Sequence, residues 1–380
     1  MEFDIHNYRH KLDKKLELIR KTRKICEENK LDILKFHNDG FSRGLSLPRI
    51  EKYLFHMYHI SLILKKPFRE VTKDDIKKLV AVIEQRDYSE WTKKDFCVVL
   101  KIFFRWLRDK EEYPEEVKWI KTTVKHYDRK LPEDLLTQEE VKKLAEAADN
   151  IRDKAFILAL YESGCRIGEL LSLKIKNVSF DNYGAVIILK GKTGGRRVRV
   201  VASSPALANW ISNHPFRNDS DSPLWILIGS RNKNQIMKYS SVCSLLKRLK
   251  ERTGLKKRLY PHLFRHSRAT FLANHFTEAQ VKEYMGWIQG SKMASIYIHL
   301  AGRDIDEAVL KLNGLIREDK ENNGVVISLL KCPRCSLSND NSSKFCSHCG
   351  FVLDQKTAME WQIQVKEYMA RIKEIKERLR

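Results

Sequence analysis

The chain has 380 residues, of which 42% are hydrophobic and 32% charged, so wholesale disorder is excluded and more than one folded core is possible. Its formal net charge of +23 favours a polyanionic partner, either nucleic acid or an anionic membrane face. The sequence has no apolar run of about 18 residues, and Met1 to Lys15 lack the apolar core of a signal peptide. We therefore expect a cytoplasmic protein that binds nucleic acid and no membrane.

Residues 1–112 are expected to form an all-helical domain. Thr72 with Asp75 and Thr92 with Asp95 have the spacing of helix capping boxes, and apolar residues at helical spacing follow each pair. Lysine and arginine fill the other helix faces, which alone is typical of solvated surfaces.

A linker and a second domain are expected next. Residues 113–136 carry two prolines among charges and little periodicity, which is typical of a linker. Thr137 with Glu140 forms another capping box, and we expect it to begin a domain that extends over 137–316.

The pattern within this second domain is mixed. An apolar helix over 155–161 is expected to end at Gly164, and 184–201 has the alternation and the glycine-rich turn of a β-hairpin. Helices are expected again from Pro205 to Leu315. The predicted fold class is α+β, mainly α, with a small β-sheet in the second domain.

Four of the eight cysteines form two C-x2-C pairs, ten residues apart: Cys332, Cys335, Cys346 and Cys349. Four thiolates at this spacing favour tetrahedral Zn²⁺ in a closed structural site, with iron as an alternative. His348 lies between two ligands and is not expected to be one. A module as short as 329–353 has too few residues for its own core, so we expect it to resemble a zinc ribbon that needs Zn²⁺ to fold.

Two charged segments border this module. Residues 317–328 are polar and expected to be a linker. Residues 354–380 are expected to form a charged helix with a narrow apolar stripe. That stripe is suited to docking on the protein itself or to a coiled coil.

Several segments of the 137–316 domain carry residues suited to phosphate chemistry. Arg166 and Glu169 lie one helical turn apart, so the carboxylate can hold the guanidinium, although such pairs are also common on ordinary surfaces. Lys192 lies at the basic tip of the hairpin, where it can donate a proton or belong to a flexible turn.

A third segment follows Pro261, which fits the first turn of a helix. His262 and Arg265 then share one helix face near an N-terminus that favours an anion. Histidine carries protons near neutral pH and arginine binds phosphate through two N–H groups. His266 is assigned a structural role.

The fourth segment holds Trp287 and, ten residues later, Tyr297, a residue that alone would be assigned to packing. Together, the order and types of these residues resemble the tyrosine recombinase family of phage integrases and Xer-type recombinases. The family order is Arg, Lys on a hairpin, His-x-x-Arg, His or Trp, then Tyr. The matching positions are Arg166, Lys192, His262, Arg265, Trp287 and Tyr297, with Glu169 at the acidic support position.

Two departures accompany this resemblance: a tryptophan stands where histidine is commoner, and the gap to Tyr297 is one residue longer than usual. The resemblance implies that 1–112 is a core-binding, DNA-binding domain and 137–316 the catalytic domain. Tyr297 would attack a DNA phosphate to form a 3′-phosphotyrosine, while Arg166 and Arg265 neutralise the phosphate.

The remaining roles follow from the same resemblance. His262 would manage the proton of the tyrosine, Lys192 would protonate the departing 5′ oxygen, and Trp287 would donate its indole N–H to the phosphate. Catalysis would need neither metal nor ATP. Four protomers would assemble on two specific sites in double-stranded DNA of a prokaryotic nucleoid and exchange strands through a four-way junction.

Other functions share parts of this pattern. The appended cysteine module favours mobile-element integration, and Xer-type resolution of chromosome or plasmid dimers is the alternative. A type IB topoisomerase uses similar residues. The N-terminal helical domain fits recombinases better, as does the segment 136–141, which resembles the usual entry into the recombinase catalytic domain. A catalytically inactive DNA-binding regulator is the alternative from another class, and the complete set of catalytic positions argues against it.

Overall fold

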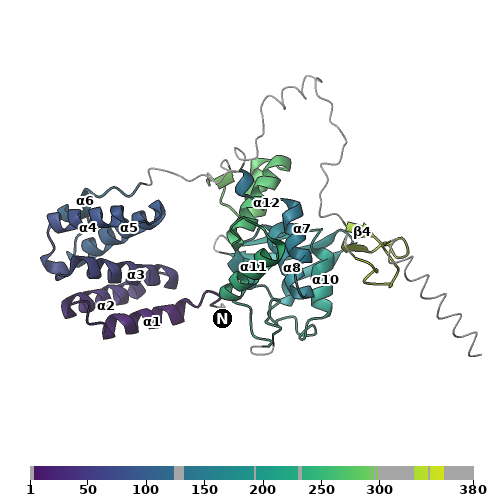
Figure 1. The fold of residues 1–380 in the computed structure, drawn as a ribbon, viewed down its shortest axis with the longest axis horizontal. Helices are drawn as coiled ribbons and strands as arrows, with labels where there is room; N and C mark the ends of the chain where they lie inside the picture. Colours follow the sequence, from purple (N-terminus) through teal and green to yellow (C-terminus); the bar gives the residue numbers. More distant parts are fainter. Residues whose placement is uncertain are drawn as a thin grey trace, which may run out of the picture. The chain divides into compact units, whose positions relative to one another are not determined.

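The computed structural model divides into two compact units, one of residues His6–Arg129 and one of Met1–Ile5 with Lys130–Arg380. Figure 1 shows the helical unit of α1 to α6 and the unit that carries α7 to α13. No helix among the described residues is long and apolar enough to cross a membrane. The described residues are 4–123, 132–191, 194–229, 233–291, 293–294, 297, 329–340 and 343–354.

The first unit is all-helical, in agreement with the predicted fold class. Its core contains aromatic side chains in edge-to-face contact: Phe103 lies 5.2 Å from Phe36 and 4.8 Å from Phe68 between ring centroids. The elements are α1 Tyr8–Lys21, α2 Glu27–Ser42, α3 Leu47–Leu64, the 3₁₀ turn Phe68–Glu70, α4 Lys73–Gln85, α5 Glu90–Leu107 and α6 Glu115–Lys118.

Helix capping explains where α4 and α5 begin. The predicted capping box between Thr72 and Asp75 is confirmed at α4. The box predicted at Thr92 is wrong, because Ser89 caps α5 one turn earlier. Its hydroxyl accepts a hydrogen bond from the backbone N–H of Thr92 at 3.2 Å, so Thr92 already belongs to the first turn.

The stretch expected as a linker begins with ordered structure. The short helix α6 lies within it, and Val117 and Ile120 are buried in the core of the first unit. Pro114 is the N-cap of α6, a position that proline tolerates, so here the proline begins a helix. Packing of this unit therefore continues past residue 112.

The second unit surrounds α8, a helix that is buried on nearly every side. Gly164 ends α8 in the left-handed conformation with a φ of 55°, at the predicted position. The helices are α7 Gln138–Glu146, α8 Ile151–Ser163, α9 Ile167–Leu171, α10 Ser204–Ser212, α11 Tyr239–Thr253, α12 Pro261–His275 and α13 Glu278–Met285, with 3₁₀ turns at Pro132–Asp134 and Ile175–Asn177.

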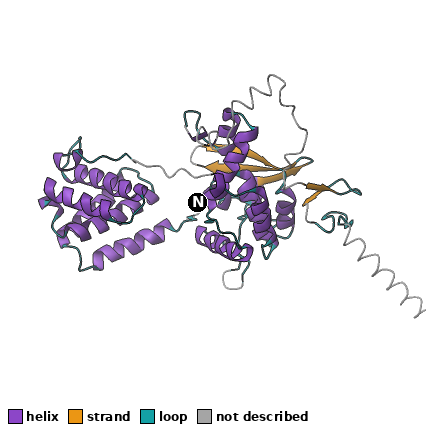
Figure 2. Cartoon of the chain, turned by 45° about the horizontal axis from the view of Figure 1, so that its top comes forward, coloured by secondary structure: helices purple, strands orange, loops and turns teal. Residues whose placement is uncertain are grey.

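A three-stranded antiparallel sheet, ordered β1-β2-β3, accompanies these helices (Figure 2). The predicted hairpin is confirmed as β2 Gly184–Gly191 and β3 Gly194–Val200. Val198 lies opposite Ile187 and both are buried, while the neighbouring Arg197 and Arg199 are exposed. The strand β1, Val178–Asp181, was not predicted from the sequence.

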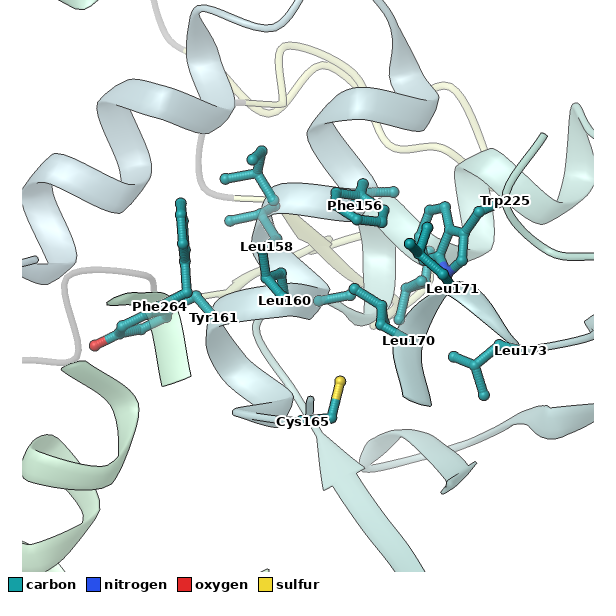
Figure 3. Packing of buried hydrophobic residues seen from close by; sticks show 14 of the residues in the cluster. Phe156, Leu158, Leu160, Tyr161, Cys165, Leu170, Leu171, Leu173, Trp225 and Phe264 are labelled. Carbon is teal, nitrogen blue, oxygen red and sulfur yellow. The ribbon is translucent and has the colours of Figure 1, made fainter. Parts of the chain in front are cut away.

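The core of the second unit packs around α8. Phe156 contacts Trp225 edge-on, with ring centroids 5.0 Å apart, and Figure 3 shows the two side chains next to each other. The same cluster includes Tyr161 and, from α12, Phe264, both labelled in Figure 3. Burying each such side chain contributes about 1.5–3 kcal/mol, so this core firmly holds the helices that carry the candidate site.

The cysteine module has two short antiparallel strands, β4 Leu329–Lys331 and β5 Ser338–Asp340. Three predictions lie outside the described residues: the helical structure expected between Tyr297 and Leu315, the linker 317–328 and, beyond Asp354, the C-terminal helix. They stay predictions.

Candidate active site

A pocket of about 310 Å³ gathers most of the residues that the sequence predicts to be catalytic. It is formed by α9, α12 and the segment that follows α13. The lining residues are Arg166, His262, Arg265, His266, Gly286, Trp287, Ile288, Ser291, Met293 and Tyr297.

Arg166 is fixed by Glu169 at the start of α9. Its Nη1 donates to Oε1 of Glu169 at 2.8 Å, and its backbone N–H donates to Oε2 at 2.9 Å. The side chain of Glu169 is 4% exposed and that of Arg166 is 34% exposed. The carboxylate is therefore a buried support, while the guanidinium remains open to a ligand.

A second arginine, Arg196 on β3, holds the other side of Glu169. Its Nη2 donates to Oε2 of Glu169 at 2.8 Å, and its Nε donates to the backbone oxygen of Tyr284 at 3.1 Å. Burial alone raises the pKa of Glu169, but the hydrogen bonds and charges of Arg196 and Arg166 outweigh burial and hold the pKa below its ordinary value. The ionised carboxylate of Glu169 thus accepts hydrogen bonds from two guanidinium groups, those of Arg166 and Arg196.

Two glycines make room for this arrangement. A Cβ at Gly286, which has a φ of +65°, would lie 2.6 Å from Nη1 of Arg196. A Cβ at Gly191 would collide with Oε1 of Glu169. A side chain at either position would therefore displace a group of this network, and the positive φ of Gly286 also favours glycine there.

The hairpin tip adjoins this network. Gly191 and Gly194 pair across the hairpin, so the tip begins next to the buried carboxylate of Glu169. Lys192 itself lies outside the described residues, and its catalytic role stays a prediction.

The helix α12 begins at a proline, as predicted, and brings His262 and Arg265 to the pocket. Arg265 is buried, and its Nη1 and Nη2 donate to the backbone oxygens of Gly164 and Met285, each at 2.7 Å. Burial, and after it the charge of Arg166, lower the pKa of Arg265 to about 10. Arg265 is still protonated at neutral pH, so it brings a fixed positive charge to the pocket.

Trp287 and Tyr297 stack in the same pocket, with ring centroids 5.3 Å apart and an angle of 10° between the planes. The guanidinium of Arg265 lies 5.5 Å from the centroid of the Trp287 ring. Tyr297 is 4% exposed, and burial raises its pKa to about 12. The phenol therefore keeps its proton at neutral pH.

His266 was assigned a structural role from the sequence, but the structure places it in the pocket. Its Nδ1 forms a hydrogen bond with the hydroxyl of Tyr297. Its ring meets that of His262 edge-on, with centroids 5.3 Å apart. The sequence held a signal for this, because residues at i and i+4 of a helix share one face.

Comparisons with known proteins point to one family. The model of the phage integrase family matches residues 134–303, which include every residue that lines the pocket. Tyrosine recombinase XerA of Pyrococcus horikoshii is 27% identical over 278 residues, which is 72% of this chain and 92% of that protein. Tyrosine recombinase XerA of Pyrococcus furiosus is 28% identical over 283 residues, 72% of this chain and 93% of that protein.

Residues 134–303 form a domain of the phage integrase family, and the chain is similar to Xer-type tyrosine recombinases. It is a site-specific recombinase that acts on DNA by breaking and rejoining strands. A crystal structure of the XerH site-specific recombinase bound to a palindromic difH substrate shares its fold, with a TM-score of 0.60 and 20% identity over 82% of this chain and 91% of that one.

The recombinase carries a second candidate site in its cysteine module. The Sγ atoms of Cys332, Cys335, Cys346 and Cys349 all lie within 4.8 Å of one another. Cys332 and Cys349 are 3.6 Å apart and Cys335 and Cys346 are 3.5 Å apart between Sγ atoms. Tetrahedral zinc with bonds of about 2.3 Å to sulfur separates its ligands by about 3.8 Å, so this donor set fits the metal.

Asn339 supports this cluster from β5 and is itself buried. Its Nδ2 lies 3.6 Å from Sγ of Cys346, and its Oδ1 accepts the backbone N–H of Ser347 at 2.9 Å. These contacts fix the second cysteine pair against the strand, as hydrogen bonds around metal ligands commonly do.

Proposed function

We propose that this recombinase cleaves DNA by attack of Tyr297 on the scissile phosphate, which leaves a 3′-phosphotyrosine and a free 5′ hydroxyl. The observation that carries the proposal is the pocket that joins Tyr297 to Arg166, Arg265 and Trp287. A phosphate bound there meets two cationic groups and an indole N–H, and a nucleophile is already present.

Each side chain then has a distinct task. Arg166 and Arg265 neutralise the non-bridging oxygens, where negative charge grows in the transition state. Trp287 and His262 donate N–H groups to the same phosphate. Lys192, at the hairpin tip, protonates the departing 5′ oxygen. The phosphotyrosine conserves the energy of the broken bond, so a 5′ hydroxyl from another duplex can reverse the step without ATP.

The DNA partner and the assembly are part of this proposal. The formal net charge of +23 suits a polyanionic duplex, and the XerH relative was crystallised with its DNA substrate. We propose that residues 1–112 and 137–316 act as core-binding and catalytic domains on specific sites in double-stranded DNA. Four protomers would exchange strands through a four-way junction.

The biological setting is proposed to be integration of a mobile element. The cysteine module lies beyond residues 134–303, the part that the family model matches, and so is an addition to the recombinase domain. Resolution of chromosome or plasmid dimers is the second candidate, because relatives that align over 92% or more of their own length are named XerA. Sequencing the DNA that the protein binds in its native genome separates the two.

The covalent step is tested by trapping it without divalent metal. The substrate is a DNA duplex that carries the recombination site of this protein and releases a short 5′ fragment after cleavage. We expect the covalent protein–DNA adduct to form at an unchanged rate after brief treatment with EDTA. The arginines, histidine, lysine and indole N–H take the part that metal ions play at other phosphoryl-transfer sites. A strict Mg²⁺ requirement for adduct formation, or attachment to the 5′ end, would contradict the proposal.

The four cysteines are proposed to hold structural Zn²⁺. We expect Cys332→Ser with Cys335→Ser to abolish stoichiometric zinc, measured by elemental analysis of the purified protein, and to unfold only the cysteine module. Cys243→Ser, at an exposed position on α11, is the matched control and should retain zinc. Adduct formation on pre-bound DNA should persist in both variants. Full zinc content in the double variant would refute the site.

A further inference from the structure

The contact between His266 and Tyr297 concerns the nucleophilic oxygen itself. The Tyr297 ring is immobilised by stacking on Trp287 and by burial, and its hydroxyl forms a hydrogen bond with Nδ1 of His266. His266 lies on α12, directly after Arg265, so one helix positions both a phosphate ligand and a neighbour of the nucleophile.

The phenol of Tyr297 has a proton to donate in this hydrogen bond. The pKa of Tyr297, raised to about 12 by burial, keeps the hydroxyl protonated at neutral pH. In the tautomer of His266 that carries its proton on Nε2, the phenol O–H donates and Nδ1 accepts. A neutral phenol is a weak nucleophile, so the attack requires a group that takes this proton.

We propose that His266 is the catalytic base that accepts the Tyr297 proton, an inference that rests on the proposed function. As the phenolic oxygen forms its bond to phosphorus, the O–H proton moves to Nδ1 of His266 and its electron pair goes into the new O–P bond. The bond from phosphorus to the 5′ oxygen breaks, and that oxygen takes a proton from Lys192. In rejoining, each proton returns by the same route.

The surroundings of His266 make this transfer reversible. The titratable and charged groups that line the pocket with it are His262 on the same helix, Arg166, Arg265 and Tyr297. The two guanidinium groups repel an imidazolium, so the protonated His266 returns its proton when the phosphotyrosine is attacked. The sequence assigned the proton to His262, but the hydrogen bond described for the hydroxyl of Tyr297 goes to His266.

The test compares His266→Phe with wild type in single-turnover adduct formation from pH 6 to 9. Phenylalanine keeps the ring and removes the acceptor. We expect cleavage at pH 7 to fall by about 10²-fold or more, with DNA binding unchanged. The residual rate should rise with pH, because hydroxide then takes the proton, whereas the wild-type rate should level off. His275→Phe, at the end of the same helix, is the matched control and should behave as wild type.

A second measurement separates proton transfer from a merely structural role. Replacing Tyr297 by a fluorinated tyrosine, whose phenol is more acidic, should restore most of the cleavage that His266→Phe loses. The assignment is overturned if the fluorinated tyrosine restores no cleavage to His266→Phe. It is also overturned if His266→Phe alone cleaves at the wild-type rate with the wild-type pH profile, or cleaves faster than wild type. If wild type itself forms no adduct, the proposed function fails, and that outcome is distinct from a failure of His266.

Discussion

Tyr297→Phe is expected to bind DNA as tightly as wild type and to form no covalent adduct. The phenylalanine ring keeps the stacking on Trp287, so the pocket is preserved while the attacking oxygen is lost. Loss of the hydrogen bond to His266 should cost about 1 kcal/mol of folding stability, too little to unfold the domain. Adduct is measured on denaturing gels with a trapping duplex, and binding is measured by titration of the same DNA.

The control for this variant is Tyr183→Phe, at a side chain that is 76% exposed, and it should cleave at the wild-type rate. Adduct at wild-type levels from Tyr297→Phe would move the nucleophile to another tyrosine, with Tyr284 and Tyr260 as the nearest candidates. Tyr284 is poorly suited, because its hydroxyl donates to the backbone oxygens of Glu162 and Arg199 at 2.9 and 3.1 Å.

Arg166→Ala and Arg265→Ala are each expected to slow cleavage by about 10²–10³-fold or more while weakening DNA binding only slightly. One phosphate contact is minor for the affinity of a chain with a net charge of +23, but the transition state gains negative charge where these guanidinium groups lie. Single-turnover rates and binding constants at fixed salt measure the two effects separately. Arg197→Ala, at an exposed position on β3, is the control.

Thermal unfolding separates the two arginines. Arg265→Ala leaves the carbonyl oxygens of Gly164 and Met285 without their donors, which should destabilise the domain by about 1–3 kcal/mol. Arg166→Ala removes one donor from the buried Glu169, but Arg196 and the backbone N–H of residue 166 still hold that carboxylate, so the loss of stability should be smaller. Equal losses of binding and rate in both variants would argue against their role in neutralising the phosphate.

Local signals predicted most of the elements around the site. The capping boxes at Thr72 and Thr137, the helix end at Gly164 and the hairpin are all confirmed, because each depends on residues within a few positions of one another. The spacing of the cysteines likewise predicted their convergence. The box at Thr92 was wrong because a competing cap, Ser89, lies one turn earlier.

Contacts between distant segments were beyond the sequence pattern. The sequence did not predict a role for Arg196, since its partners Glu169 and Tyr284 lie 27 and 88 positions away in the chain. The strand β1 has four residues and is recognisable only from its pairing with β2. The place of His266 in the pocket was missed for a different reason: its i+4 relation to His262 was visible, but nothing local indicated that Tyr297 would reach it.

The close approach of Arg196 to Gly286 has a consequence for engineering chimaeras from related recombinases. The two positions belong to different segments, yet any side chain at 286 would meet the guanidinium of Arg196. Exchanging the β2–β3 hairpin alone would therefore import or remove an arginine without the matching residue at 286. A graft that keeps both positions from the same parent should preserve the support of Glu169, and with it the orientation of Arg166.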